Sequence, residues 1–281
     1  MIIAVIGLGL IGGSMALDLR QRGFAQTIVG VDNNPIHTLK ALELGIVDVV
    51  LPLNRAVAHA DLVIVAIPVQ QIIAILPDIL SLIPPHAIVL DLGSAKEAIV
   101  ESIRQHPLRK RFVAAHPMAG TEYSGPEAAL SGLFDQKVAI ICNEHESAPD
   151  AVQIVEQLFA TLNMPLRRME ANEHDMHVAY ISHISHISSF VLATAVLEKE
   201  KSVNTIFDLA SGGFASTVRL AKSSPQMWRP IFEQNSHYVL EVLDTYLSHL
   251  QHWRQLIADQ QFDTIEKMMT RANEIKRVLD R

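Results

Sequence analysis

The chain has 281 residues, of which 49% are hydrophobic and 19% are charged. This balance excludes an intrinsically disordered protein, and the length is typical of two domains rather than one. The formal net charge of −7 provides no basic surface of the kind that nucleic-acid-binding proteins carry, so no nucleic-acid partner is expected.

The first half of the chain alternates short apolar runs with amphipathic stretches, which is typical of a parallel sheet covered by helices on both faces. The predicted strands are residues 2–6, 27–31, 62–67, 87–91, 112–115, 137–141 and 165–170. The predicted helices between them are residues 13–20, 35–44, 69–80, 95–104 and 150–162. We therefore expect an α/β fold with an N-terminal Rossmann-like, doubly wound, mostly parallel sheet over residues 1–170.

The second half of the chain reads as helices, and glycine and proline become sparse. The predicted helices are residues 173–200, 204–210, 217–223, 227–258 and 262–280. A run of helices behind an α/β half predicts a separate all-helical domain over residues 171–281. Its apolar part, from Tyr180 to Leu250, is too extensive to be buried by four or five helices alone, so we expect this domain to form a homodimer.

A glycine-rich loop, Gly7-Leu8-Gly9-Leu10-Ile11-Gly12, follows the first strand and opens the first helix. Its glycines permit a tight turn, a close approach of the backbone to a pyrophosphate, and close packing of helix on strand. Asp32 ends the second strand, where a carboxylate accepts hydrogen bonds from the adenine ribose and repels a 2′-phosphate. The pattern predicts a site for NAD rather than NADP, to which Pro68, after the third strand, is also assigned. The alternative is a glycine-rich turn beside a helix-capping Asp32.

Two polar segments follow predicted strands, whose carboxyl ends face the ligand crevice of a parallel sheet. Ser94 lies in the segment from Asp91 to Lys96, and the alternative role for its hydroxyl is to cap the helix 95–104. His116 begins the segment His116-Pro117-Met118-Ala119-Gly120-Thr121-Glu122. A histidine there can accept a proton from a substrate hydroxyl while hydride leaves the same carbon. The alternative is a structural loop histidine.

Two histidines in the helical half, His183 and His186, are spaced so that both lie on one face of a helix. Three interpretations remain open: hydrogen-bonded core histidines, metal ligands together with His174 and His177, or the lining of a pocket for an anionic substrate. No suitably spaced aspartate or cysteine completes an obvious metal site, so no metal is expected.

Arg219 follows the double glycine Gly212-Gly213 and begins a predicted helix among apolar neighbours. A guanidinium at such a place is suited to bidentate binding of a carboxylate. The alternative is an ordinary surface arginine.

Taken in chain order, these segments resemble the prephenate/arogenate dehydrogenase family over almost the whole chain. The most specific is the run from His116 to Glu122, and the glycine loop is the least specific. The other matching segments are Gly93 to Lys96, the paired histidines, Gly212-Gly213-Phe214 with Arg219, and Ser224-Pro225-Gln226-Met227-Trp228. The resemblance implies NAD-dependent oxidative decarboxylation of prephenate to 4-hydroxyphenylpyruvate in tyrosine biosynthesis, with arogenate as the alternative substrate.

The resemblance also implies roles for individual residues. His116 would be the catalytic histidine at the ring hydroxyl, with Ser94 beside it, and Arg219 would hold a substrate carboxylate. The pocket would be lined by His183 and His186, with His186 also assigned to catalysis, and Thr121 and Glu122 would lie at its mouth. Trp228 would lie near the interface between paired helical domains.

One departure from the family pattern concerns the two positions after Phe214. Members of the family often carry a charged pair there, which forms an ionic network with the first paired histidine. This chain has Ala215 and Ser216 instead, which weakens the role assigned to His183.

Two rival functions predict different features. A β-hydroxyacid dehydrogenase would need a catalytic lysine in a glycine-containing helix, but no lysine follows Gly212-Gly213 until Lys222. A non-enzymatic NAD-sensing module would need no converging histidines.

The cellular location is predicted from the cysteine content and the apolar segments. Cys142 is the only cysteine, so the chain cannot form an internal disulfide, which fits a reducing compartment. The apolar N-terminus, residues 1–6, has no basic region before it and runs into the glycine loop, unlike a signal peptide. No apolar stretch reaches membrane-spanning length without polar interruption. We therefore expect a cytoplasmic protein with no membrane partner.

Overall fold

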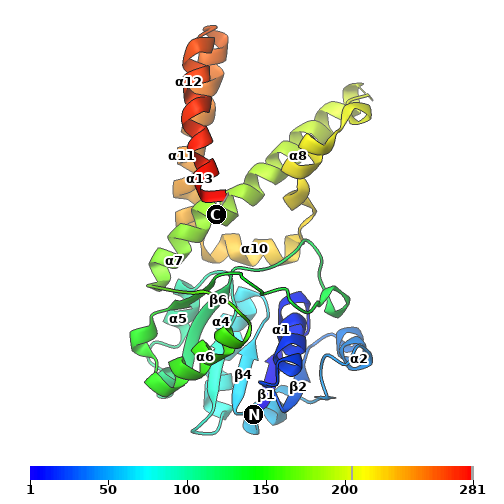
Figure 1. Cartoon of the computed structure of the whole chain (residues 1–281), viewed down its shortest axis with the longest axis vertical. Helices are drawn as coiled ribbons and strands as arrows, with labels where there is room; N and C mark the ends of the chain where they lie inside the picture. The colour runs from blue at the N-terminus through cyan, green and yellow to red at the C-terminus, as the bar shows by residue number, and fades with distance from the viewer. Residues whose placement is uncertain (204, 280–281) are drawn as a thin grey trace. The chain divides into compact units, whose positions relative to one another are not determined.

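The structure, a computed structural model, describes residues 1–203 and 205–279 (Figure 1). Two predicted helices include a residue outside this range. These residues are Asn204 in the helix 204–210 and Asp280 in the helix 262–280. The chain forms two compact units, Met1–Ser236 and His237–Arg281.

One sheet of eight strands, in the order β3-β2-β1-β4-β5-β6-β7-β8, organises the first unit. All neighbouring strands are parallel except the antiparallel pair β6 and β7, so the predicted mostly parallel sheet is confirmed. The strand order reverses between β1 and β4, and in open α/β sheets ligands bind beside the carboxyl ends of the strands at such a point. The strands are β1 (Ile2–Ile6), β2 (Thr27–Val31), β3 (Val49–Val50), β4 (Leu62–Val65), β5 (Ile88–Asp91), β6 (Phe112–Pro117), β7 (Ala139–Cys142) and β8 (Leu166–Met169).

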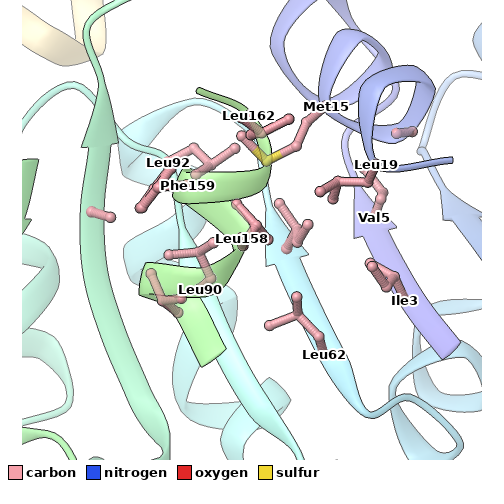
Figure 2. Close-up of a cluster of buried hydrophobic side chains, with 14 of the residues drawn as sticks. Ile3, Val5, Met15, Leu19, Leu62, Leu90, Leu92, Leu158, Phe159 and Leu162 are labelled. Carbon is pink, nitrogen blue, oxygen red and sulfur yellow. The ribbon is translucent and has the colours of Figure 1, made fainter. Parts of the chain in front are cut away.

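Helices cover both faces of this sheet. Figure 2 shows the first face, where Met15 and Leu19 of α1 and Phe159 of α6 pack over the strands. The other face is covered by α3, α4 and α5, and also by α10, which packs against α4. The helices are α1 (Leu10–Gln21), α2 (Pro35–Glu43), α3 (Leu53–Ala58), α4 (Val69–Leu82), α5 (Glu97–Ser102), α6 (Pro149–Thr161) and α10 (Pro225–Gln234).

The side chains of β1 alternate between the two faces, which explains why the strand is continuously apolar. Ile3 and Val5 join the first core cluster, whereas Ala4 and Ile6 join the second. Each fully buried aliphatic or aromatic side chain contributes about 1.5–3 kcal/mol, so burial on both faces stabilises the sheet. Cys142 is likewise buried in β7, and burial raises the pKa of its thiol to about 12.

The predicted helix 173–200 is divided by a π turn. It consists of α7 (Ala171–Val178), the π turn Ala179–His183 and α8 (Ile184–Val203). Single π turns within α-helices are frequent at functional sites, because the extra residue re-aims the side chains around it. After α8 come α9 (Gly212–Thr217) and the 3₁₀ turn Arg219–Lys222.

The predicted single helix over residues 227–258 is wrong. It is two helices, α10 and α11 (Ser236–Ala258), separated at Asn235, where φ is −113° and ψ is 24°. In the second unit, α11 is followed by α12 (Phe262–Ala272) and α13 (Lys276–Leu279), with Leu256 and Ile265 buried.

The boundary between the compact units, at Ser236 and His237, lies beyond the start of the helical half. Residues 171–236 stay with the sheet because Ala171, Trp228 and Ile231 belong to its second core cluster. The domain boundary that the sequence suggests, between residues 170 and 171, stays a prediction.

One helical stretch, Ala171–Val203, is long and apolar enough to cross a membrane by length and composition alone. Its most apolar window has a mean hydropathy of 1.4 and is 11% buried. A single such stretch is weak evidence for a membrane span, because an apolar helix of a soluble protein passes the same test.

Candidate active site

The glycine loop between β1 and α1 has the shape that a dinucleotide requires. Gly7 has φ +95°, and a Cβ there would lie 2.4 Å from the carbonyl oxygen of Ala66. A Cβ on Gly12 would lie 2.0 Å from the carbonyl oxygen of Gly7, so neither position accepts a side chain. A Cβ on Gly9, at the start of α1, would meet no heavy atom within 4 Å, which leaves open space for a diphosphate.

Asp32 connects this loop to the end of β2. Its Oδ2 accepts a hydrogen bond from the Leu8 amide at 2.9 Å, and its Oδ1 accepts one from the Asn34 amide at 2.9 Å. Asn34, not Asp32, caps α2 by accepting from the Ile36 amide, so the helix-cap alternative for Asp32 is wrong. Each carboxylate oxygen has a further lone pair that can accept from a ribose hydroxyl, so these residues fit a dinucleotide.

The other residues assigned to the cofactor also lie at the carboxyl ends of β1 and β4. Leu10 and Ile11 form the first turn of α1, and Pro68 is exposed immediately before α4. Their contact with a dinucleotide stays a prediction.

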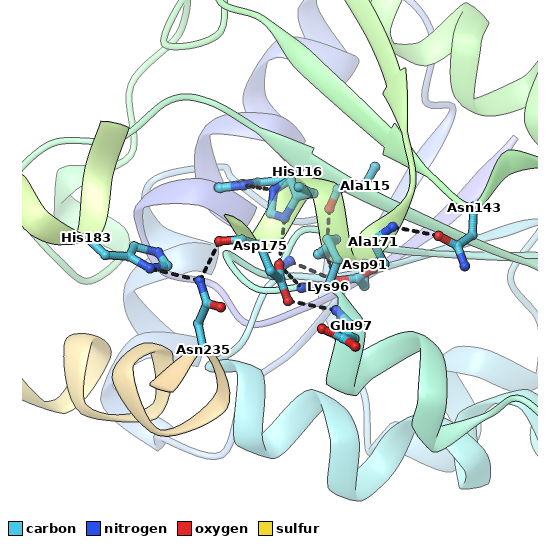
Figure 3. A network of polar contacts seen from close by, with 12 residues as sticks. Asp91, Lys96, Glu97, Ala115, His116, Asn143, Ala171, Asp175, His183 and Asn235 are labelled. Atoms are coloured by element: carbon cyan, nitrogen blue, oxygen red, sulfur yellow. Dashed lines mark hydrogen bonds and ion pairs between the residues drawn. The ribbon is translucent and has the colours of Figure 1, made fainter. Parts of the chain in front are cut away.

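His116 lies in β6, one residue before the strand ends, and is linked to α7 by hydrogen bonds (Figure 3). Its Nδ1 lies 2.8 Å from Nε2 of His174, and Nδ1 of His174 lies 2.7 Å from Oδ1 of Asp175. Asp175 also accepts from the amides of Lys96 at 2.7 Å and Glu97 at 2.9 Å. His116 therefore belongs to a polar network that joins β6, α5 and α7.

Both imidazoles of this network are uncharged at neutral pH. Burial lowers the pKa of His116 well below its usual 6.5, and the nearby His174, Lys96 and His183 lower it further. Burial lowers the pKa of His174 to about 3, with Lys96 acting in the same direction. A neutral imidazole has one donor and one acceptor nitrogen, so His116 can accept a proton.

A buried ion pair supports the turn that carries Ser94. The Lys96 ammonium pairs with the Asp91 carboxylate and donates to the carbonyl oxygen of Ala115 at 2.8 Å. Asp91 also accepts from the Gly93 amide at 2.8 Å, which fixes the turn beside β6. Burial raises the pKa of Asp91, whereas the charge of Lys96 opposes that rise.

Ser94 does not cap the helix after it, so the capping alternative is wrong. The helix α5 begins at Glu97 rather than at residue 95, and the Lys96 and Glu97 amides donate to Asp175 instead. Within residues 1–203 and 205–279, the Ser94 hydroxyl makes no hydrogen bond, and its side chain is half-buried beside β6.

His183 and His186 both face Trp228, which confirms that they share one side of the helical segment. The ring centroids of His183 and Trp228 are 5.7 Å apart, and those of His186 and Trp228 are 3.6 Å apart. Burial lowers the pKa of His183 to about 4, although Asp175 opposes this shift. Trp228 is buried within one chain, and its proximity to a subunit interface stays a prediction.

Asn235 holds His183 and explains the break between α10 and α11. Its Nδ2 donates to the Asp175 carbonyl oxygen at 2.8 Å and lies 3.1 Å from Nδ1 of His183. Among the residues that the structure describes, the charged network implied by the resemblance is absent, since Ser216 donates to the carbonyl oxygen of Gly213. An uncharged amide takes its place at His183.

The metal interpretation of the histidines finds no support in the part of the chain that the structure describes. It contains no group of three or more His, Cys, Asp or Glu residues arranged to hold a metal ion. His174, one of the suggested ligands, is instead hydrogen-bonded to His116 and Asp175.

Arg219 lies in the 3₁₀ turn after α9 and meets the loop that follows His116. Its Nη1 lies 3.5 Å from Oε2 of Glu122, and its side chain is 53% exposed. Thr121 accepts from the Tyr123 amide at 3.2 Å in the same loop. Burial lowers the pKa of His186, and the positive charge of Arg219 lowers it further, so the two side chains interact electrostatically.

Ser189 fixes the turn on both sides of Arg219. Its buried hydroxyl donates to the Thr217 carbonyl oxygen at 3.0 Å and accepts from the Ala221 amide at 3.1 Å. Sequence reasoning missed Ser189, Asn235, Asp175 and the Asp91–Lys96 pair. The one signal for that pair was two charged residues flanking the Gly93–Ser94 turn.

Two family models match this chain. "Prephenate dehydrogenase, nucleotide-binding domain" matches residues 15–166, and "Prephenate dehydrogenase, dimerization domain" matches residues 170–271. The prephenate dehydrogenase of Bacillus subtilis is 31% identical over 98% of this chain and 75% of its own length. The cyclohexadienyl dehydrogenase of Zymomonas mobilis is 29% identical over 93% of this chain and 90% of its own length.

Solved structures of the same family have the same fold. Prephenate dehydrogenase from A. aeolicus, in complex with hydroxyphenyl propionate and NAD+, matches with a TM-score of 0.91 and 30% identity over 100% of this chain and 98% of that one. Synechocystis arogenate dehydrogenase matches with a TM-score of 0.80 and 29% identity over 99% of this chain and 100% of that one. These matches confirm the predicted resemblance, and the chain belongs to the prephenate/arogenate dehydrogenase family of oxidoreductases.

Proposed function

We propose that this protein catalyses the NAD-dependent oxidative decarboxylation of prephenate to 4-hydroxyphenylpyruvate. The observation that carries the proposal is the neutral imidazole of His116, hydrogen-bonded at Nδ1 and placed at the carboxyl end of β6, in the same sheet whose β1 leads into the glycine loop. The relative with bound NAD+ supports the choice of cofactor, together with the fit of Asp32 and the glycine loop.

Each residue of the site has its own role in the proposed reaction. His116 accepts the proton of the ring hydroxyl, and Ser94 orients that hydroxyl. NAD, when bound, supplies the hydride acceptor for the hydroxyl-bearing carbon. Arg219 binds a substrate carboxylate, and His183 and His186 line the pocket. Loss of the ring carboxylate as CO2 makes the ring aromatic, which drives the reaction forward.

Arogenate is the second candidate substrate, because relatives of similar identity are named as arogenate and cyclohexadienyl dehydrogenases. Steady-state kinetics with prephenate and with arogenate, each with NAD and with NADP, decide between them. We expect the highest kcat/KM with prephenate and NAD. A higher kcat/KM with arogenate would assign arogenate as the substrate. No turnover of either compound would contradict the proposed reaction.

The carboxylate of Asp32 predicts discrimination against NADP. Asp32→Ser removes the charge that repels a 2′-phosphate, so kcat/KM should rise for NADP relative to NAD. The comparison is a cofactor titration at saturating prephenate. Glu43→Ser, on the exposed end of α2, is the matched control and should leave the ratio unchanged. Equal kcat/KM for both cofactors in the unmodified protein would contradict the role of Asp32.

Ser189→Ala should raise KM for prephenate by roughly fivefold with little change in kcat. The substitution removes two hydrogen bonds that flank Arg219, and a lost buried hydrogen bond costs about 1 kcal/mol. Ser188→Ala is the control, since the Ser188 hydroxyl donates to the Ile184 carbonyl oxygen within α8. An unchanged KM in Ser189→Ala would show that the turn holds Arg219 without this hydroxyl.

A homodimer formed through the helical domain is part of the proposal. The match to a dimerization domain over residues 170–271 supports it, as do the exposed apolar residues Ile181, Val191 and Leu197. Light scattering at micromolar concentration should give twice the chain mass of 31.0 kDa. A stable monomer would contradict it. The expected cytoplasmic location stays a prediction.

A further inference from the structure

We propose that Asp175 and His174 are positioning residues that fix the tautomer of His116. In this arrangement the proton of the His116 ring is on Nδ1, and Nε2 presents its lone pair to the substrate. The inference deepens the proposed function, because it rests on His116 as the acceptor of the hydroxyl proton. It follows from the order of three hydrogen-bonding groups (Figure 3).

The two carboxylate oxygens of Asp175 both face N–H donors. Oδ1 accepts from the Lys96 amide at 2.7 Å and Oδ2 accepts from the Glu97 amide at 2.9 Å. Each of these amide hydrogen bonds is stronger to a charged carboxylate than to a neutral carboxyl group. Burial raises the pKa of Asp175, but both amides and the Lys96 ammonium favour the charged form. Asp175 is therefore an ionised acceptor.

An ionised Asp175 determines the state of His174. Oδ1 of Asp175 can only accept, so Nδ1 of His174, 2.7 Å away, must carry a proton. His174 is neutral because burial lowers its pKa to about 3. Its Nε2 therefore has a lone pair and no proton.

The tautomer of His174 in turn determines that of His116. Nε2 of His174 can only accept, so Nδ1 of His116, at 2.8 Å, must donate. Because His116 is also neutral, its Nε2 has no proton and is free to accept one. During the reaction the O–H bond of the substrate breaks and an N–H bond forms at Nε2. The positive charge that His116 gains is stabilised through His174 by the Asp175 carboxylate.

A neutral Asp175 would reverse the direction of the two hydrogen bonds that join Asp175, His174 and His116. It would donate to Nδ1 of His174, Nε2 of His174 would donate to His116, and the His116 proton would move to Nε2. His116 would then have no lone pair toward the substrate. The charge of the Asp175 carboxylate, which is linked to His116 through His174, thus decides whether His116 can act as a base.

Neighbouring elements hold Asp175 and His174 in place. The amides at the start of α5 bind the Asp175 carboxylate, and Asn235 binds its carbonyl oxygen at 2.8 Å. At the start of α7, the Ala171 amide donates to Oδ1 of Asn143 at 2.7 Å. The other titratable groups that act on the two imidazoles are Lys96, His177 and His183, and Lys96 is paired with Asp91.

The first test reads the tautomer directly in the unmodified protein. Ring ¹⁵N shifts and N–H couplings of ¹⁵N-histidine-labelled protein distinguish a protonated Nδ1 from a protonated Nε2, and the His116 signals are those absent from His116→Asn. We expect a neutral His116 with its proton on Nδ1 at pH 7.5. A proton on Nε2, or a cationic ring, would overturn the inference. This reading needs no substrate, so it is independent of the proposed reaction.

The second test changes the charge of Asp175. Asp175→Asn should move the His116 proton to Nε2 and lower kcat by roughly 100- to 10,000-fold, the contribution expected of a general base, with KM little changed. Glu173→Gln, an exposed change on the same helix, should keep kcat within about twofold of the unmodified protein. Retention of kcat within about threefold in Asp175→Asn would overturn the inference.

The third test uses His174 and remains informative if Asp175→Asn does not fold. His174→Gln offers an amide oxygen to Nδ1 of His116, whereas His174→Phe offers no acceptor. We expect His174→Gln to retain at least about tenfold more kcat than His174→Phe. Asn172→Phe, an exposed change on the same helix, is the control with unchanged kcat. Equal kcat in the two His174 variants would overturn a hydrogen-bonding role.

Discussion

Replacing His116 with asparagine is expected to lower kcat by roughly 100- to 10,000-fold, the usual contribution of a general base. Asparagine keeps the polarity and approximate size of the side chain but cannot take a full proton. Because the substrate is bound mainly by other groups, KM for prephenate should change little. The measurement is kcat from NADH formation at saturating prephenate and NAD.

The pH profile gives a second readout of the same residue. Burial lowers the pKa of His116, and His174, Lys96 and His183 lower it further, so the neutral base persists as the pH falls below 6.5. The acid limb of kcat/KM should therefore lie below the usual histidine pKa. In His116→Asn the limb that belongs to this group should disappear.

A matched control separates loss of the base from general damage. His86→Asn changes an exposed histidine just before the amino end of β5, and it should leave kcat unchanged. NAD binding, measured by fluorescence quenching, should be nearly intact in His116→Asn. Near-full kcat in His116→Asn would show that the base is wrongly assigned, and His186 would become the candidate.

The sheet was predictable because each strand is buried on both faces and is therefore continuously apolar. The β1 strand, Ile2–Ile6, has the bounds that the sequence predicts. The two-residue strand β3, Val49–Val50, and the short helix Leu53–Ala58 were missed, since neither is long enough to show a period. The break at Asn235 was also missed, because its cause is a side-chain contact with Asp175 rather than a helix-breaking residue.

The candidate site was predictable where topology alone places residues. Asp32 and Ser94 follow the parallel strands β2 and β5, and His116 lies one residue before the end of β6, which is parallel to β5, so all three lie at the carboxyl ends of strands along one edge of the sheet. The partners of His116 were not predictable, because His174 and Asp175 reach it only when α7 packs beside α5. Helical periodicity describes the faces of a helix, but not which neighbour those faces meet.

Replacing Arg219 with alanine is expected chiefly to raise KM for prephenate, in contrast to the loss of kcat in His116→Asn. Arg219 binds a carboxylate that is present in the ground state and in the transition state alike, so uniform binding is lost. Truncating one partner of a charge-assisted pair in a desolvated site costs about 2–5 kcal/mol. The 53% exposure of the side chain favours the lower end, which corresponds to a rise in KM of roughly 30-fold.

Two further variants test whether the guanidinium itself is responsible. Arg219→Lys keeps the charge but loses the planar pair of donors, so its KM should lie between those of the unmodified protein and Arg219→Ala. Arg229→Ala removes an exposed arginine of α10 that pairs with Glu233, and KM should not change. NAD affinity should be nearly intact in all three. An unchanged KM in Arg219→Ala would show that Arg219 is a surface residue, and the carboxylate site would then have to be sought around His183 and His186.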